Sequence, residues 1–155
     1  MNTYLFVKTI HIISSTILFG TGIGIAFFMF RSYFTNDLNQ KIYAAKYTVT
    51  ADYIFTLPAV IVQLITGAWL VWKSGYDWLD FWLVATYIIY VIAGLCWVPV
   101  VWIQIKLKNI LIQCRANKSA VPDQYHKLFK IWFFLGWPAF LGLVVVFFLM
   151  VIKPQ

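Results

Sequence analysis

The sequence predicts an all-α integral membrane protein, a four-helix bundle, and three observations support this prediction. Hydrophobic residues make up 63% of the 155 residues and charged residues only 11%, with a mean hydropathy of +0.82. Soluble domains are about 45–50% apolar and about 25% charged. Four separate stretches reach the roughly 20 apolar residues that a transmembrane helix needs. Short connections carry most of the charged residues. We therefore predict a single transmembrane domain.

The four predicted helices cover residues about 4–30, 49–72, 79–105 and 128–152, with the third extending to about 116. The first connection, residues 31–48, is polar, with TNDLNQK at its centre, and leaves open a short extra interfacial helix. Gly75 and Asp77 indicate a tight turn between the second and third helices. Asn117, Ser119 and Pro122 indicate that the third helix ends before them.

Lysine and arginine residues are distributed unevenly between the two ends of the predicted bundle. Three lie at the end with the chain termini: Lys8, Lys73 and Lys153. Nine lie at the other: Arg31, Lys41, Lys46, Lys106, Lys108, Arg115, Lys118, Lys127 and Lys130. The positive-inside rule then predicts both termini on the periplasmic face of a bacterial inner membrane. The net charge is +7. We interpret the basic residues as topology signals that also contact lipid headgroups, and not as a nucleic-acid site.

Small residues and prolines inside the apolar stretches predict features of helix packing. Gly20 and Gly24 form a small-xxx-small pair, which favours a helix contact inside one bundle over dimerisation. Pro58, Pro99 and Pro138 each lie within an apolar stretch, where they predict kinks or a widened cavity. The oligomeric state stays open, with a homo-oligomer or a membrane partner subunit as the alternatives to a monomer.

Ionisable side chains inside a bilayer are costly, so each one is a candidate functional residue. His11 lies about two turns into the first helix. A neutral imidazole there can ligate haem iron or another metal, relay protons, or form a hydrogen bond to a neighbouring helix. Lys8 lies one turn earlier on the same face and either pairs with a propionate or lipid phosphate or snorkels to the surface.

Matching depths across the predicted helices places several polar side chains near His11. Gln63 and Thr66 reach this level on the second helix, and Tyr87 and Tyr90 reach it on the third. Together they form a polar layer in the outer third of the bundle. This layer lines a cofactor or substrate pocket, or else it provides hydrogen bonds between helices.

Asp52 is the one carboxylate within a predicted membrane span, near the inner end of the second helix. We expect it to form a structural salt bridge, with Arg31, Lys106 or Lys130 as its partner. The sequence has no glutamate, and its other aspartates lie in connections or at helix ends. A proton-driven pump would need a second carboxylate in the membrane, so the composition argues against one.

Several segments resemble a DUF2269-like family of predicted bacterial integral membrane proteins of unknown function. These segments are VKTIHIISSTILFGTG, ADYIFTLPAVIVQLITGAWLV, CWVPVVWIQI and WFFLGWPAF, and the resemblance covers almost the whole chain. It implies the topology described above and no particular activity.

The layout is also similar, more distantly, to the HemJ-type protoporphyrinogen oxidases, which are small haem-containing membrane proteins. The similar features are the pair Lys8 and His11, Pro58 followed by the stretch TGAWL, and a closing Lys-Pro. This resemblance implies that His11 is a haem ligand. The chain departs from the HemJ-type pattern at WLVATYIIY, which lacks that family's His-x-Lys-type motif.

Two functional predictions follow from the sequence. The first is a cofactor-free helical bundle of unassigned activity: a small transporter, a lipid-binding protein or a partner subunit. The alternative is a haem b membrane protein with His11 as axial ligand, active in electron transfer or in HemJ-like oxidation. The sequence contains none of the motifs HExxH, CxxCH or GxSxG and no phosphate-binding loop.

Overall fold

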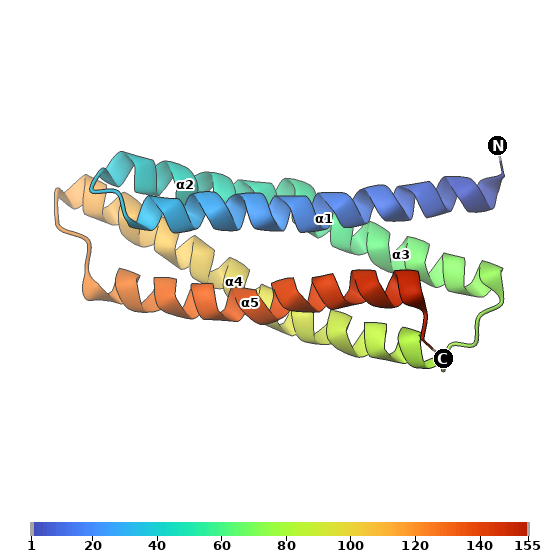
Figure 1. Cartoon of the computed structure of the whole chain (residues 1–155). Coiled ribbons are helices and arrows are strands. Elements are labelled where there is room, and N and C mark those ends of the chain that lie inside the picture. The colour runs from blue at the N-terminus through green and yellow to red at the C-terminus, as the bar shows by residue number, and fades with distance from the viewer. Residues whose placement is uncertain (1, 155) are drawn as a thin grey trace.

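The computed structural model describes residues 2–154, and within them all regular structure is helical (Figure 1). The elements are α1 (Thr3–Tyr33), α2 (Leu38–Ala51), the π-helix η1 (Asp52–Thr56), α3 (Leu57–Ser74), α4 (Phe81–Asn117) and α5 (Asp123–Ile152). α2, η1 and α3 run on as one helix of 37 residues, so residues 2–154 contain four helices long and apolar enough to cross a membrane. The predicted all-α four-helix membrane bundle is confirmed.

Local side-chain chemistry determines where several helices begin and end. The side chain of Asn2 accepts a hydrogen bond from the backbone N–H of Tyr4 at 3.0 Å and caps α1. Asp37 caps α2 in the same way, through the backbone N–H of Asn39 at 2.8 Å. α3 ends at Gly75, whose φ of 69° is the left-handed conformation that glycine adopts without strain.

The second membrane helix begins eleven residues earlier than the sequence predicts, at Leu38 instead of about residue 49. Residues 38–48 are therefore neither a polar connection nor a separate interfacial helix. The buried side chains of α2, Lys41, Ile42, Ala45, Thr48 and Val49, recur at helical spacing, and α2 packs against α1 and α4. This amphipathic stripe stabilises a helix that average polarity alone does not reveal.

Pro58 produces a local change of helix type in place of a simple kink. A proline cannot donate the backbone hydrogen bond of a regular helix, and its ring clashes with the preceding turn. The five residues before the α3 segment, Asp52–Thr56, widen into a π-helix, and Leu57 N–H bonds to the carbonyl of Asp52. Such π-bulges are rare and occur frequently at functional sites. Pro99 and Pro138 lie inside α4 and α5, which remain helical through them.

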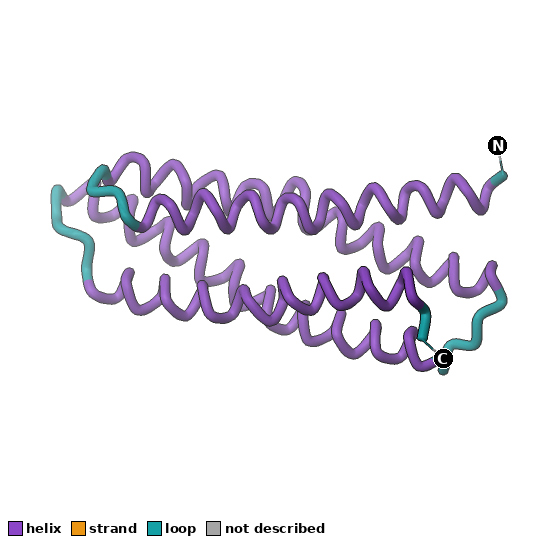
Figure 2. The backbone as a smooth tube through the Cα atoms, in the orientation of Figure 1, coloured by secondary structure: helices purple, strands orange, loops and turns teal. Residues whose placement is uncertain are grey.

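The helices pack as two pairs that are held together mainly at one end. α1 lies along α3, and α4 lies along α5 (Figures 1 and 2). α2 joins the pairs by contacting both α1 and α4, whereas the backbones of α1 and α5 come close at few positions and meet mainly through aromatic side chains. The main hydrophobic core, built around Met29, Leu107, Leu111 and Tyr125, lies at the end with the α1–α2 and α4–α5 connections. We call this the basic end.

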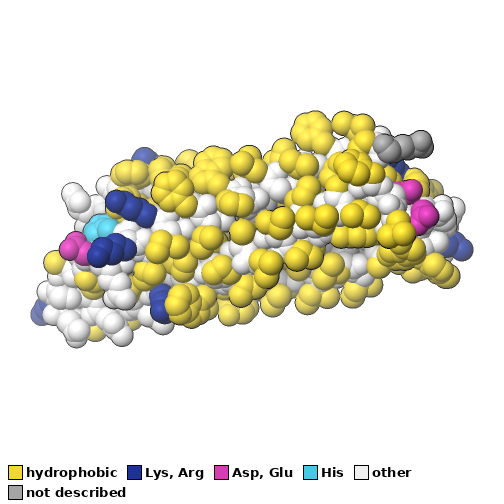
Figure 3. Space-filling model, turned by 90° about the horizontal axis from the view of Figure 1, so that it is seen from below, with side chains coloured by type: hydrophobic (Ala, Val, Ile, Leu, Met, Phe, Trp, Pro, Cys, Tyr) yellow, Lys and Arg dark blue, Asp and Glu magenta, His cyan; other side chains and the backbone are white. Residues whose placement is uncertain are grey.

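The surface has the pattern of a membrane protein. Hydrophobic side chains cover the middle of the molecule, and the charged groups gather at its two ends (Figure 3). Large apolar side chains are exposed along the helices, for example Phe28, Leu95 and Phe134. A bilayer can cover such a surface, because lipid tails are as apolar as these side chains.

The prediction that Gly20 and Gly24 form a helix contact inside the bundle is wrong. A Cβ atom added at either position would meet nothing within 4 Å in the part of the chain described. The reason is geometric: α1 turns these two glycines away from its neighbours, and the close approaches occur elsewhere. A Cβ at Gly142 would come within 2.9 Å of Ile89, where α5 packs closely on α4.

Candidate ligand-binding pocket

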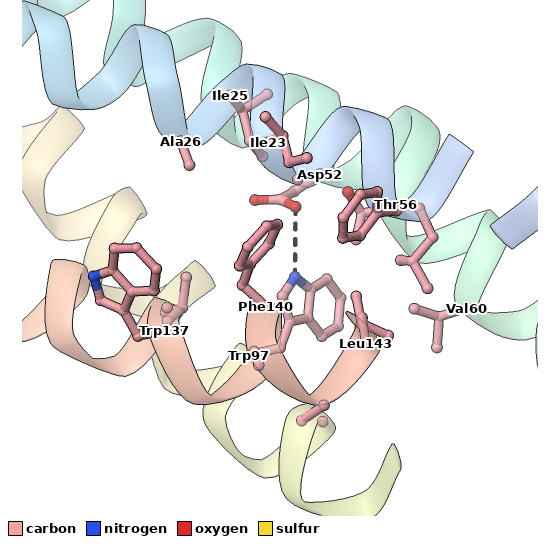
Figure 4. Close-up of a pocket in the computed structure, with 18 of the residues that line it drawn as sticks. Ile23, Ile25, Ala26, Asp52, Thr56, Val60, Trp97, Trp137, Phe140 and Leu143 are labelled. Atoms are coloured by element: carbon pink, nitrogen blue, oxygen red, sulfur yellow. Dashed lines mark hydrogen bonds between the residues drawn. The ribbon is translucent and has the colours of Figure 1, made fainter. Parts of the chain in front are cut away.

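A cavity of about 340 Å³ lies midway along the bundle, where all four membrane helices face one another. We call it the Asp52 pocket. Its walls are mostly apolar and aromatic, with side chains from α1 above and from α5 below (Figure 4). Ligand sites of this size are usually apolar with a few convergent polar groups. The lining residues are Leu18, Phe19, Gly22, Ile23, Ile25, Ala26, Asp52, Thr56, Val60, Tyr90, Ala93, Gly94, Trp97, Val100, Gln104, Trp132, Phe133, Gly136, Trp137, Ala139, Phe140 and Leu143.

Three glycines help to keep the Asp52 pocket open. Gly22, Gly94 and Gly136 line it from α1, α4 and α5. A Cβ added at any of the three would have no heavy atom within 4 Å. The absence of side chains at these glycines therefore leaves open space. None of the three glycines lies at a close contact between helices. Larger residues at these positions would project into the cavity.

Asp52 is the polar centre of this pocket. The residue is only 3% exposed, and its side chain points from η1 towards α4 and α5 (Figure 4). Oδ1 accepts a long hydrogen bond of 3.4 Å from Trp97 Nε1, and Oδ2 has no partner. The polar neighbours of the carboxyl group are Thr56, Trp97 and Gln104. A carboxylate can accept about four hydrogen bonds, and the donors beside it, Trp97 and the hydroxyl of Thr56, leave part of this capacity unused.

Other polar atoms of the pocket also lack partners. Thr56 Oγ1, Gln104 Oε1 and Trp132 Nε1 are buried without a hydrogen bond. Their residues are 4%, 2% and 5% exposed. Leaving one such group unsatisfied costs about 1–3 kcal/mol, and native interiors contain few of them. The concentration of four around one cavity indicates a site that a bound molecule completes.

The expected salt bridge from Asp52 to Arg31, Lys106 or Lys130 does not form among the described residues. Arg31 and Lys130 are exposed, and Lys106 Nζ lies 3.5 Å from the centre of the Trp102 ring. The longer second helix explains the difference, because the 14 residues of α2 precede Asp52 and carry it away from the helix end. The basic side chains stay near the surface, while Asp52 faces the interior.

The polar layer around His11 forms between α1 and α3. His11 Nδ1 lies 2.8 Å from Thr66 Oγ1, and Gln63 Nε2 donates to the His11 carbonyl and to Ser14 Oγ, at 2.6 and 2.7 Å. The predicted meeting of His11, Gln63 and Thr66 is therefore correct. These hydrogen bonds join α1 to α3. They match the second of the two interpretations of the polar layer, hydrogen bonding between helices.

The remaining members of the predicted layer lie elsewhere. Tyr90 donates to the carbonyl of Val60 at 3.1 Å and lines the Asp52 pocket. Tyr87 is 38% exposed, and Lys8 is exposed on α1. The reason is that α4 packs along α5 and not along α1, so equal depth does not bring its tyrosines to His11.

The surroundings of His11 do not fit a haem. Its ring packs against α3, where a Cβ added at Gly67 would lie 3.2 Å from His11 Cε1. A porphyrin needs a large cavity beside its axial ligand, and His11 lines neither the Asp52 pocket nor the groove between α1 and α2. Among the described residues, no cluster of three or more His, Cys, Asp or Glu side chains offers a metal site.

His11→Ala should lower the free energy of unfolding by about 0.6 kcal/mol, and by no more than about 1.7 kcal/mol, because it removes an interhelical hydrogen bond. Thr66→Val removes the same bond from the other side and should cost a similar amount. Unfolding titrations in mild detergent measure both. A Soret band in the wild-type spectrum that disappears in His11→Ala would contradict the structural role.

The sequence identifies Lys41 only as one of the basic residues that indicate topology, whereas the structure buries its side chain. Its side chain is 7% exposed, and Nζ donates to the carbonyls of Ser32 and Tyr33 at 3.1 and 2.5 Å. These carbonyls belong to the last turn of α1, where a positive charge also complements the helix dipole. The rings of Tyr33 and Tyr125 lie 5.4 and 5.7 Å from Nζ. This cluster joins α1, α2 and α5 at the basic end.

Comparison with known families agrees with this architecture. The model of the family described as "Predicted integral membrane protein (DUF2269)" matches residues 5–154. The chain belongs to this family. The DUF2269 match spans all four membrane helices and confirms the family resemblance carried by the sequence segments. No curated protein and no solved structure matches the chain, and these comparisons show no similarity to the HemJ-type oxidases.

Proposed function

We propose that this DUF2269 protein binds a small amphiphilic molecule inside the bilayer, in the Asp52 pocket, as a small transporter or membrane-embedded binding protein. The observation that carries the proposal is a cavity between four helices in which a buried carboxylate oxygen has no partner. Burying polar groups without hydrogen bonds is costly. A bound ligand that forms hydrogen bonds with these polar groups would offset the free-energy cost of burying them, and this best explains their presence in an otherwise apolar cavity.

The packing of the helices supports a route to the pocket from the lipid. α1 and α5 contribute many of the lining residues, and their backbones come close at few positions, so aromatic side chains such as Phe19 on α1 and Phe140 on α5 make the contact between them. An amphiphile dissolved in the bilayer can therefore reach the pocket by displacing side chains, without separating closely packed backbones. The basic excess at one end supports an orientation with that end in the cytoplasm of a bacterial inner membrane and with periplasmic termini.

Filling the pocket should abolish binding. Gly22→Leu and Gly94→Leu each place a side chain in the cavity, whereas Gly24→Leu on the same helix as Gly22 projects outside it. The probes are labelled 4-phenylbutan-1-ol and 4-phenylbutylamine, which share an apolar body. Saturation binding is measured on each purified protein in lipid nanodiscs.

We expect at least one probe to bind saturably to the wild type and to Gly24→Leu. Its affinity for Gly22→Leu and for Gly94→Leu should be at least tenfold lower. Leucine favours helix more than glycine does, so the filled variants should fold. The absence of saturable binding by either probe, or equal binding by all four proteins, would refute a ligand site in this pocket.

A further inference from the structure

The oxygen atoms of the Asp52 pocket point to a class of ligand. We propose that the pocket selects protonated amines with an apolar body, whose ammonium group donates hydrogen bonds to Asp52, Thr56 and Gln104. This inference rests on the proposed function, because it names the substrate class of the same pocket. The argument uses the hydrogen-bonding character of the free atoms, the charge of the lining and the kinds of side chain around it.

The unpartnered oxygens call for a hydrogen-bond donor. Asp52 Oδ2 can only accept when the carboxyl group is ionised, Gln104 Oε1 is an acceptor, and Thr56 Oγ1 can accept. Turning the Gln104 amide would exchange its oxygen and nitrogen and give the carboxylate one donor. Even with the Thr56 hydroxyl and Trp97 as two further donors, the carboxylate would keep one of its roughly four acceptor sites free. An ammonium group carries up to three N–H donors on one atom.

The charge of the lining favours a cation. Among the described lining residues, Asp52 is the one ionisable acid, and none is Lys, Arg or His. In surroundings of low dielectric constant an unpaired carboxylate is strongly destabilised, and a counter-charge at hydrogen-bond distance removes much of that cost. An anionic ligand would instead add a second negative charge beside Asp52. A cation is therefore the charge state that this pocket stabilises.

The rest of the lining favours an organic cation over a metal ion. Hard metal cations such as Ca²⁺ take six to eight oxygen ligands, and the side chains here supply few. Aromatic rings of Phe19, Trp97, Trp137 and Phe140 line the same cavity. Such rings pack against an apolar body, and their faces attract a nearby positive charge. The pocket thus provides an acidic oxygen cluster at one point and apolar walls around it.

The test compares compounds that share the phenylbutyl body and differ in the head group. 4-Phenylbutylamine should bind the wild type in nanodiscs at least tenfold more tightly than 4-phenylbutan-1-ol, as expected for a charge-assisted hydrogen bond. The quaternary (4-phenylbutyl)trimethylammonium keeps the charge but has no N–H donor, so it should bind more weakly than the amine. Asp52→Asn should remove the preference for the amine and change the affinity for the alcohol by less than threefold.

The outcomes separate this inference from the proposed function. Equal affinities for amine and alcohol, unchanged in Asp52→Asn but lost in Gly94→Leu, would overturn the amine class and leave the pocket as a binding site. Displacement of the amine by Na⁺ with no effect on the alcohol would overturn it in favour of a metal ion. Failure of every compound to bind would refute both. Matching thermal unfolding of Asp52→Asn and the wild type, or a higher midpoint in the variant, shows that the variant is folded.

Discussion

Replacing Asp52 with leucine is expected to raise the free energy of unfolding of the ligand-free protein by about 1–3 kcal/mol. This is the range for removing a buried polar group that has no hydrogen-bond partner; Asp52 Oδ2 is such a group, and the bond that Oδ1 accepts from Trp97 is long, at 3.4 Å, so its loss offsets little of the gain. The apolar side chain of leucine also suits the surrounding walls. Most substitutions of buried residues destabilise a protein, so a gain at this position would be distinctive. Unfolding titrations in mild detergent measure the change.

Two further variants make the Asp52 result specific. Asp52→Asn keeps the shape of the side chain and removes the charge, so it should also be at least as stable as the wild type. Asp37→Ala removes the cap of α2 and should instead lose about 1 kcal/mol. A clear loss of stability in both Asp52 variants would mean that the carboxyl group supports the fold, and would contradict its assignment to ligand binding.

Lys41→Met should lower the free energy of unfolding by about 2–3 kcal/mol. The substitution leaves the carbonyls of Ser32 and Tyr33 without their donor at the end of α1. A hydrogen bond to a charged group contributes about 1.5–3 kcal/mol, and the two bonds share one ammonium group whose own burial is costly, so their joint loss stays within about this range. It also removes the cation that lies beside the Tyr33 and Tyr125 rings. The methionine side chain retains most of the apolar packing.

Lys46→Met on the same helix is the matched control, because Lys46 is exposed. Surface substitutions of this kind usually change stability by no more than about 0.5 kcal/mol. If Lys41→Met and Lys46→Met unfolded at the same detergent concentration as the wild type, the buried lysine would have no role in joining α1, α2 and α5.

The long apolar stretches made the membrane fold predictable. Runs of 20 or more hydrophobic residues have no other stable arrangement in a small protein, and α1, α4 and α5 follow them closely. Residues 38–48 escaped prediction because their stability comes from a narrow buried stripe on a polar helix, including Lys41, and not from average hydropathy. Pro58 predicts an irregularity, and the structure shows its form, a π-helix over Asp52–Thr56.

The site was less predictable than the fold, for a geometric reason. Counting residues along a helix gives depth, and depth correctly brought together His11, Gln63 and Thr66. It does not give the direction in which a side chain points. Depth therefore predicts a structural salt bridge for Asp52 near the inner end of its helix, whereas the structure directs the Asp52 side chain towards a cavity. The sequence does not identify Gln104 and Trp132 as site residues. A buried polar atom without a hydrogen-bond partner can be recognised only when the positions of all its neighbours are known.

Carbodiimide labelling tests the central claim, a ligand site inside the bundle anchored by Asp52, most directly. Dicyclohexylcarbodiimide dissolves in bilayers and couples to protonated carboxyl groups in apolar surroundings, where a carboxylate without a counter-charge takes up a proton. The other four aspartates are not in the pocket and serve as internal controls. Peptide mass spectrometry after labelling in nanodiscs locates the product. We predict modification at Asp52, with protection by saturating (4-phenylbutyl)trimethylammonium, which has no N–H to couple to the activated carboxyl group, and loss of labelling in Gly94→Leu. Labelling that avoids Asp52, or that neither this cation nor the filled cavity reduces, would contradict the account.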